Sequence, residues 1–343
     1  MSYIGRGGKV RKSRKGKCGH HKSKTKSAKR IRFKILSAER QSEFGQSHRR
    51  CYRKRQSKTS AEEMTSAQMP AGNLFTFVRM ELSSVLNLAR SFAEEAGNAA
   101  LSMQDHLGNI RFKTPKDVVT VADMESERIL VSRIRERFPK HSIRTEEAGH
   151  VKDGSQFEWI IDPVDGTLNF SRGIPLWGVS LALVEKSESA AKPLIAAVYL
   201  PGLGKIYSAY RGGGAFVNGK KISVSATSEL SKAIVSNGDF NVGDWAKINA
   251  QNLKNFRNEA ENCSRVKCYG SAVVEGTLVA QGSLDAFVMT MSYPWDIAGI
   301  ALLVQEAGGK VSELSGEPVR FIDGEQVLFS NGILHEQMIQ ILK

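Results

Sequence analysis

The first regular pattern along the chain is helical. From Met80 to about Gln104, apolar residues recur every three or four positions with serine and glutamate between them, which predicts one long amphipathic helix. The segment 112–123 then has the composition of a turn, and a second helical face follows Asp123. We therefore expect Asp123 to cap the start of this second helix.

Short runs of β-branched and aromatic residues dominate the middle of the chain. Strands are expected at Ser142–Thr145 and from Trp159 onward. Further runs continue from Ile174 to Ser225, and the Asn218-Gly219 pair between two of them is typical of a hairpin turn. These runs predict an antiparallel sheet of about four strands.

Strands and helices alternate in the last third of the chain. We expect strands at 233–237, 265–270, 284–289, 310–314 and 327–330, and helices at 244–260, 271–282, 295–309 and from Leu334. The pattern as a whole predicts an α+β body over 80–343. Its first half, 80–225, would hold the antiparallel sheet, and its second half, 226–343, would be mixed α/β.

Charge changes the picture only at the amino-terminal end. The formal net charge of +14 comes from residues 1–60, which hold 21 Lys and Arg against Glu39 and Glu43; this leaves a net −5 for the rest. With so few apolar residues, we expect residues 1–68, here called the basic leader, to be disordered. Three other readings stay open: nucleic-acid binding through residues 1–60, an organelle transit peptide, or an extension upstream of a start at Met69 or Met80.

The sequence predicts a cytoplasmic protein with no membrane span. It contains no apolar run long enough to cross a bilayer, and no apolar segment of a secretory signal follows the basic start. Cys263 and Cys268 have no further cysteine or histidine at metal-ligand spacing. We therefore expect both to be free thiols in a reducing compartment.

The candidate chemistry centres on Trp159–Phe170, WIIDPVDGTLNF. An apolar strand there breaks into Asp162-Pro163-Val164-Asp165, and Gly166-Thr167 follows. The two carboxylates offer the oxygen ligands that a divalent ion prefers. The Gly-Thr turn offers backbone N–H groups to an anion, more so if a helix begins there. The alternative is an ordinary turn with two solvated acids.

Other acids also stand at expected strand ends or helix starts, namely Asp123, Glu146, Glu147 and Asp296. The sequence has no nucleophile motif, no phosphate-binding glycine loop and no zinc-binding His-Glu motif. A site made of carboxylates and a Gly-Thr turn suits Mg²⁺ better than Zn²⁺, and it suits phosphoryl chemistry.

The chain from about Met80 onward resembles the inositol monophosphatase superfamily of Mg²⁺-dependent, lithium-sensitive phosphatases. WIIDPVDGTLNFSRGIPLWGVSLAL resembles the first family motif, and WDIAGIALLVQEAGG resembles the second. The supporting segments DVVTVAD, EEAG and RGGGAFVNGKKISVS occur in the order that the family has. The resemblance implies a layered α-β-α-β-α sandwich. It also implies hydrolysis of a small phosphate monoester, of the inositol 1-phosphate type, by metal-activated water without a covalent intermediate.

The same resemblance implies a role for each site residue. One Mg²⁺ would be held by Glu146, Asp162 and the main-chain carbonyl of Val164, a second by Asp162, Asp165 and Asp296, and a third ion would approach Glu146. The implied catalytic residues are Asp123, Thr167 and Glu147, of which Asp123 and Thr167 would orient and deprotonate the attacking water. The phosphate would bind to the N–H groups of Gly166 and Thr167. The alcohol side would be lined by Gly270, Ser271 and Ala272.

One position departs from the family pattern. Relatives that act on inositol carry a glutamate seven residues before the aspartate of the second motif, and this chain has Met289 there. A thioether accepts hydrogen bonds poorly, so discrimination among polyols is in question. Histidinol phosphate, a sugar phosphate and a 3′-phosphonucleotide stay open as substrates. Two partner hypotheses also stay open: a homodimer, and a role as an RNA- or ribosome-associated factor through the leader.

Overall fold

The computed structural model describes residues 71–106, 111–114, 117–151, 154–187, 191–240 and 245–343. The basic leader lies outside the described residues, and so do the predictions made for it. The part described belongs to one compact unit, Met64–Lys343. Cys263 and Cys268 are free thiols, as predicted. Among the described residues, no helix combines the length and the apolar character that a bilayer crossing requires.

The larger sheet has eight strands in the order β10-β9-β8-β7-β6-β5-β3-β4. Its members are β3 (Ser142–Thr145), β4 (Gly149–Val151), β5 (Phe157–Asp165), β6 (Gly178–Lys186), β7 (Ala191–Leu200), β8 (Lys205–Tyr210), β9 (Gly214–Val217) and β10 (Lys220–Ile222). Neighbouring strands are antiparallel except for β3 and β5, which are parallel. The sheet is therefore larger than predicted and mixed, because β5, β3 and β4 extend the hairpin-linked strands. The predicted Asn218-Gly219 turn does join β9 to β10, with both residues at positive φ.

A second sheet of five strands has the order β12-β11-β13-β15-β14. It consists of β11 (Ile234–Asn237), β12 (Arg265–Lys267), β13 (Ala286–Met289), β14 (Lys310–Glu313) and β15 (Val327–Ser330). β11 runs parallel to both β12 and β13, while β15 runs antiparallel to β13 and β14. The carboxyl ends of β11, β12 and β13 consequently lie at one edge of this sheet.

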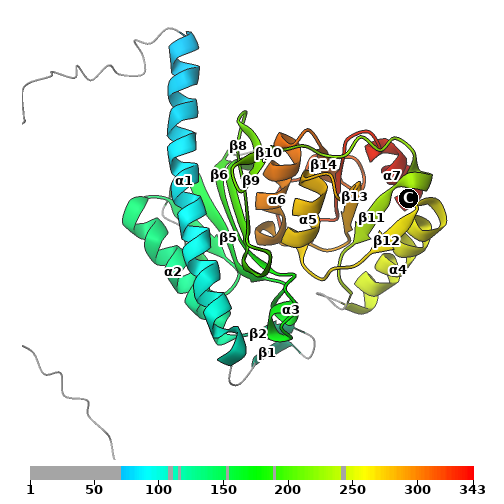
Figure 1. Cartoon of the computed structure of the whole chain (residues 1–343), viewed down its shortest axis with the longest axis horizontal. Helices are drawn as coiled ribbons and strands as arrows, with labels where there is room; N and C mark the ends of the chain where they lie inside the picture. The colour runs from blue at the N-terminus through cyan, green and yellow to red at the C-terminus, as the bar shows by residue number, and fades with distance from the viewer. Residues whose placement is uncertain (1–70, 107–110, 115–116, 152–153, 188–190, 241–244) are drawn as a thin grey trace, which may run out of the picture. The chain divides into compact units, whose positions relative to one another are not determined.

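Helices form three layers around the two sheets (Figure 1). α1 (Ala71–Met103) and α2 (Val121–Arg137) pack on the larger sheet, α5 (Ala272–Ala280) and α6 (Pro294–Glu306) lie between the sheets, and α4 (Trp245–Asn262) and α7 (His335–Leu342) pack on the smaller sheet. Strand alternation separates the two faces of the larger sheet. Ile161 and Leu181 face α1 and α2, whereas Ile160 and Ala182 face α5 and α6. This is the α-β-α-β-α sandwich that the resemblance predicted.

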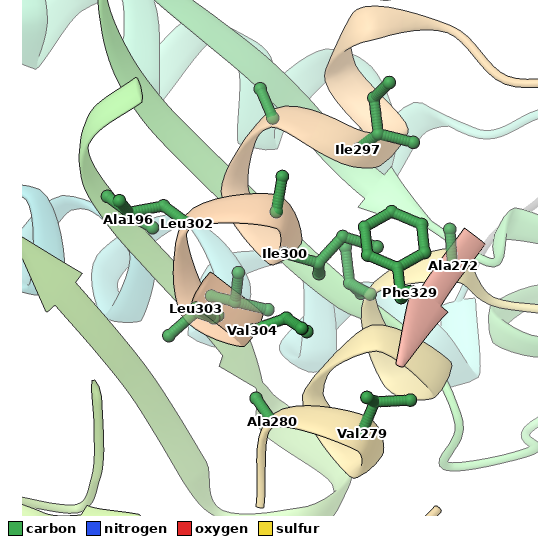
Figure 2. Close-up of a cluster of buried hydrophobic side chains, with 14 of the residues drawn as sticks. Ala196, Ala272, Val279, Ala280, Ile297, Ile300, Leu302, Leu303, Val304 and Phe329 are labelled. Carbon is green, nitrogen blue, oxygen red and sulfur yellow. The ribbon is translucent and has the colours of Figure 1, made fainter. Parts of the chain in front are cut away.

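The middle of α6, Ile297–Val304, is apolar on every side because both sheets cover it. Figure 2 shows its residues Ile297, Ile300 and Leu303 with Ala196 of β7 and Phe329 of β15 around them, all of them buried. Glycines permit the close contacts of this layer. A Cβ on Gly276 of α5 would lie 2.5 Å from Ile300 Cδ1, and a Cβ on Gly299 of α6 would lie 2.6 Å from the Ser180 hydroxyl of β6.

Near the amino-terminal end of the body, the predictions of a turn at 112–123 and of a helix that begins at Met80 are wrong, and the prediction that Asp123 caps the second helix is confirmed in part. The segment 112–123 is a β-hairpin, β1 (Arg111–Thr114) with β2 (Asp117–Val119), and not a turn. α2 begins at Val121 with Thr120 as its N-cap residue, and Asp123 contributes to the cap from inside the first turn, where its carboxylate accepts the Thr120 N–H at 2.8 Å. α1 also begins earlier than Met80, at Ala71. The strands β1 and β2 are too short to show a clear alternation of polar and apolar residues. Thr120 and Asp123 both contribute to the cap of α2, so the sequence pattern did not show which of them precedes the helix.

Candidate active site

The end of β5 carries the first two acids of the site. Asp162 and Asp165 are buried, and their pairing with β6 is irregular between them. The Val164 N–H donates to Asp162 Oδ1 at 3.1 Å, and Ser126 of α2 donates to the Pro163 carbonyl at 2.7 Å. These two bonds hold the Asp162 carboxylate and the Pro163 backbone in the turn that ends the strand.

A third acid comes from a distant part of the chain. Asp296 is the third residue of α6, where its Oδ2 accepts the Tyr293 N–H at 2.7 Å. One carboxylate oxygen each from Asp162, Asp165 and Asp296 lie within 4.8 Å of one another. The structure thus brings together three of the residues predicted to hold metal, and it does so at the junction of β5 and α6.

Burial and mutual repulsion make these acids hard to ionise. Burial, followed by the charges of Glu146, Asp165 and Asp296, raises the pKa of Asp162 well above its ordinary value. Burial also raises the pKa of Asp296, and it raises that of Asp165 to about 6. Among the described residues, Asp162, Asp165 and Asp296 form no ion pair with Lys, Arg or His. A bound cation would offset this repulsion, so the cluster fits a divalent metal ion.

Glu146 and Glu147 follow β3 and are both half-buried. The charge of Glu146 raises the pKa of Asp162 and of Asp296, which places it beside the cluster. Glu127 of α2 holds this turn: its Oε2 accepts the Thr145 hydroxyl, the Glu147 N–H at 3.0 Å and the Ala148 N–H at 3.3 Å. Sequence reasoning missed Glu127, because a glutamate in an amphipathic helix is expected to face solvent.

Asp123 and Thr167 meet beside the same turn. Asp123 is buried, and its Oδ2 accepts the N–H and hydroxyl of Thr120 at 2.8 and 2.5 Å. Its Oδ1 faces Thr167, whose hydroxyl lies 3.1 Å from that oxygen and 2.9 Å from the Val164 carbonyl. Burial raises the pKa of Asp123, and the hydrogen bonds from Thr120 and Thr167 partly offset this.

The start of α5 forms the opposite wall. Asp165 accepts the Ser271 hydroxyl, the Ala272 N–H at 3.2 Å and the Val273 N–H at 3.0 Å. Gly166 has a φ of +83°, and a Cβ there would lie 3.0 Å from Ser271 Cβ, so only glycine allows this close approach. The turn at Gly270, Ser271 and Ala272 therefore packs directly against the turn after β5.

Asn169 is a second residue that the sequence analysis did not single out. It lies in the short helix α3 (Thr167–Ser171), and its Nδ2 donates to the Leu176 carbonyl at 2.8 Å and the Tyr269 carbonyl at 2.7 Å. It joins the β5–α3 turn to the segment before α5. Met289 is mostly buried in the core between the two sheets.

Comparison with known proteins identifies the family. A sequence model described as "Inositol monophosphatase family" matches residues 81–343. The chain belongs to this family. It is a phosphoric monoester hydrolase with the family's layered fold, as the resemblance predicted. The match begins after the basic leader, about which it therefore says nothing.

Several relatives match most of their own length. The chain is 34% identical to a fructose-1,6-bisphosphatase/inositol-1-monophosphatase of Thermotoga maritima, over 75% of this chain and 95% of the relative. It is 35% identical to a putative Nus factor SuhB of Neisseria meningitidis, over 76% and 98%. Among solved structures, the suhB protein of Bartonella henselae superposes with a TM-score of 0.70 at 29% identity, over 76% of this chain and 98% of that one.

Two further similar structures were determined with ions present. An IMPase/NADP phosphatase was solved with Mg²⁺ and phosphate; it is 25% identical, with a TM-score of 0.66, over 76% of this chain and 95% of that one. A staphylococcal inositol monophosphatase was solved as an LiCl-soaked inhibitory complex; it is 26% identical, with a TM-score of 0.67, over 76% and 94%.

Proposed function

We propose that this chain hydrolyses a small phosphate monoester of the inositol 1-phosphate type, with Mg²⁺ as its metal. The observation that carries the proposal is the cluster of Asp162, Asp165 and Asp296, three carboxylates within 4.8 Å with no cationic partner among the described residues. Carboxylate oxygens are the ligands that Mg²⁺ prefers. A related IMPase/NADP phosphatase solved in complex with Mg²⁺ and phosphate supports the same choice.

We assign the ligands as Glu146, Asp162, Asp165, Asp296 and the main-chain carbonyl of Val164, for two or three ions. When bound, Mg²⁺ supplies positive charge that neutralises the phosphate and the leaving oxygen. The N–H groups of Gly166 and Thr167 bind the phosphate at the start of α3.

The chain's own residues activate the water. The Thr167 hydroxyl lies within hydrogen-bond distance of both Asp123 Oδ1, at 3.1 Å, and the Val164 carbonyl, at 2.9 Å. When its one hydrogen is directed to Asp123, its oxygen accepts a hydrogen from the attacking water. As the attacking water gives a proton to Thr167 Oγ1, the hydroxyl proton of Thr167 passes to the Asp123 carboxylate. The raised pKa of Asp123 favours that acceptance. We assign Glu147 as the third catalytic residue. The hydrogen bond from the Glu147 N–H to the Glu127 carboxylate holds it beside Glu146.

A phosphate-release screen tests this proposal. Wild type and Asp162→Asn are incubated with inositol 1-phosphate, histidinol phosphate, a hexose phosphate and a 3′-phosphonucleotide, with and without Mg²⁺ and with added Li⁺. We expect Mg²⁺-dependent, lithium-inhibited turnover by wild type and none by Asp162→Asn, because a carboxylate that would hold the metal loses its charge. Asp105→Asn, an exposed site after α1, is the matched control and should stay active. Near-normal turnover by Asp162→Asn would contradict the metal assignment.

A second candidate function belongs to the basic leader. Residues 1–60 carry a net +19, which favours binding to a phosphate backbone. Relatives of the body carry the name Nus factor SuhB. We infer an additional RNA-associated role through residues 1–60, separate from the catalytic site. A homodimer and a cytoplasmic location stay predictions.

A further inference from the structure

The edge of the smaller sheet brings one more carboxylate to the alcohol side of the site. β11 and β13 are parallel neighbours, and after β11 the chain continues through Gly238 to Asp239. The Gly238 N–H donates to the Val288 carbonyl at 2.7 Å, and a Cβ on Gly238 would lie 3.7 Å from both Cα and Cγ of Met289. Asp239 therefore leaves the sheet directly beside Met289.

The Asp239 side chain reaches the turn before α5. A Cβ on Gly270 would lie 3.5 Å from Asp239 Oδ2 and 3.4 Å from Asn169 Nδ2. The charge of Asp239 also contributes to the raised pKa of Asp165, which agrees with this closeness. Asp239 Oδ2 consequently borders the turn at Gly270, Ser271 and Ala272, on the side proposed to receive the alcohol.

The loop that carries Asp239 is held in place while the residue itself stays exposed. Asn252 of α4 donates to the Asp239 carbonyl at 2.9 Å, and the Phe240 N–H donates to Oδ1 at 2.9 Å. Among the described residues, Asp239 forms no ion pair with Lys, Arg or His. The Asp239 carboxylate therefore has no cationic partner in the described part of the protein, and it can contact a ligand bound beside Gly270.

We propose that Asp239 is a specificity residue that binds the alcohol portion of the substrate. This inference rests on the proposed phosphatase function. Its carboxylate accepts a hydrogen bond from a hydroxyl or an ammonium group, which the thioether of neighbouring Met289 cannot do well. The same negative charge repels a second phosphate. The favoured substrates are monophosphates of polyols or amino alcohols, and bisphosphates and phosphonucleotides are disfavoured.

The test compares kcat/KM of the full-length Mg²⁺ enzyme on four probes. Inositol 1-phosphate offers hydroxyls, histidinol phosphate an ammonium, and fructose 1,6-bisphosphate a second phosphate; p-nitrophenyl phosphate has an alcohol portion without hydrogen-bond donors. For Asp239→Ala we expect about a tenfold or larger loss on the better of the first two probes, as for a lost hydrogen bond to a charged group. The kcat/KM of Asp239→Ala on fructose 1,6-bisphosphate should be higher than that of wild type. p-Nitrophenyl phosphate should be unchanged, which also shows that the variant is folded.

Two further variants separate the causes. Asp239→Asn removes the charge but keeps an acceptor, so it should cost more on histidinol phosphate than on inositol 1-phosphate. Glu261→Gln removes an exposed carboxylate near the end of α4 and should change no ratio. Equal changes on all four probes, no change on any, or a wild-type preference for the bisphosphate would overturn the role of Asp239. Absence of Mg²⁺-dependent hydrolysis of every probe by wild type would instead overturn the proposed function.

Discussion

The hydroxyl of Thr167 lies between two acceptors, Asp123 Oδ1 at 3.1 Å and the Val164 carbonyl at 2.9 Å. For Thr167→Ala we expect kcat to fall by roughly 10²-fold or more, as for the loss of a general-base partner. Binding of Mg²⁺ should be largely kept, because the variant retains every carboxylate of the cluster. Steady-state kinetics together with calorimetric Mg²⁺ titration measure the two effects separately.

Thr167→Ser is the matched control for this change. It keeps the hydroxyl and removes only a methyl group, so it should retain most of the activity. An unchanged kcat in Thr167→Ala would refute the proposed relay between Thr167 and Asp123. A large loss of Mg²⁺ affinity in the alanine variant would instead assign Thr167 to the metal site.

At the residue scale, the sequence pointed to the acids that the structure brings together better than to the residues that hold the surrounding turns. Asp162 and Asp165 stand out because a strand that ends in two acids and a glycine is unusual. Glu127 and Asn169 carry no such signal, since a helical glutamate and a turn asparagine are ordinary surface residues. Their importance depends on backbone groups of Glu147 and Tyr269, which only the folded chain brings within reach.

The packing of α4 on β11 buries an acid that takes no part in the proposed chemistry. Glu259 of α4 is fully buried, its carboxylate accepts the Asn237 side-chain amide at 3.1 Å, and burial raises its pKa to about 8. A pKa raised by folding means that the stability from this group is lost as pH rises toward 8. We expect Glu259→Gln to remove this loss. The difference in unfolding free energy between the variant and wild type should therefore shift in favour of the variant by roughly 2–3 kcal/mol from pH 6 to pH 9.

Urea unfolding of the Mg²⁺-free proteins at both pH values measures this difference. The comparison with wild type cancels the titration of the metal-site carboxylates, which both proteins share. Glu261→Gln, two residues further along α4 and exposed, should show no such gain. A constant difference between Glu259→Gln and wild type across this pH range would show that Glu259 is already ionised at pH 6.

The elements that the sequence predicted best are those with a long pattern or a strong turn. Examples are α6, which is apolar from Ile297 to Val304 and is followed by Gly308-Gly309, and the hairpin at Asn218-Gly219. The hairpin of β1 and β2 was missed because its strands are too short to show alternation. The start of α2 was misplaced because Thr120 and Asp123 form a capping box, in which either residue alone resembles an N-cap.

The arrangement of the layers explains how distant acids form one site. α6 lies between the two sheets, and its first turn brings Asp296 to the end of β5. α5 lies in the same layer, and its first N–H groups bond Asp165. The sequence could place each acid at the end of an element, but the distances between them depend on how the elements pack, and the family resemblance supplied that information.

The basic leader separates from this body in sequence and in charge, so its role can be tested by removal. A chain that begins at Met69 keeps every described element, because α1 begins at Ala71. We expect full-length protein to bind single-stranded RNA with an affinity that falls steeply with salt, and the shortened protein to lose this binding. Filter binding at several salt concentrations measures it, and kcat should be equal for both proteins because all proposed site residues follow the deletion. Equal RNA binding by the two proteins would exclude the leader as the RNA-binding element.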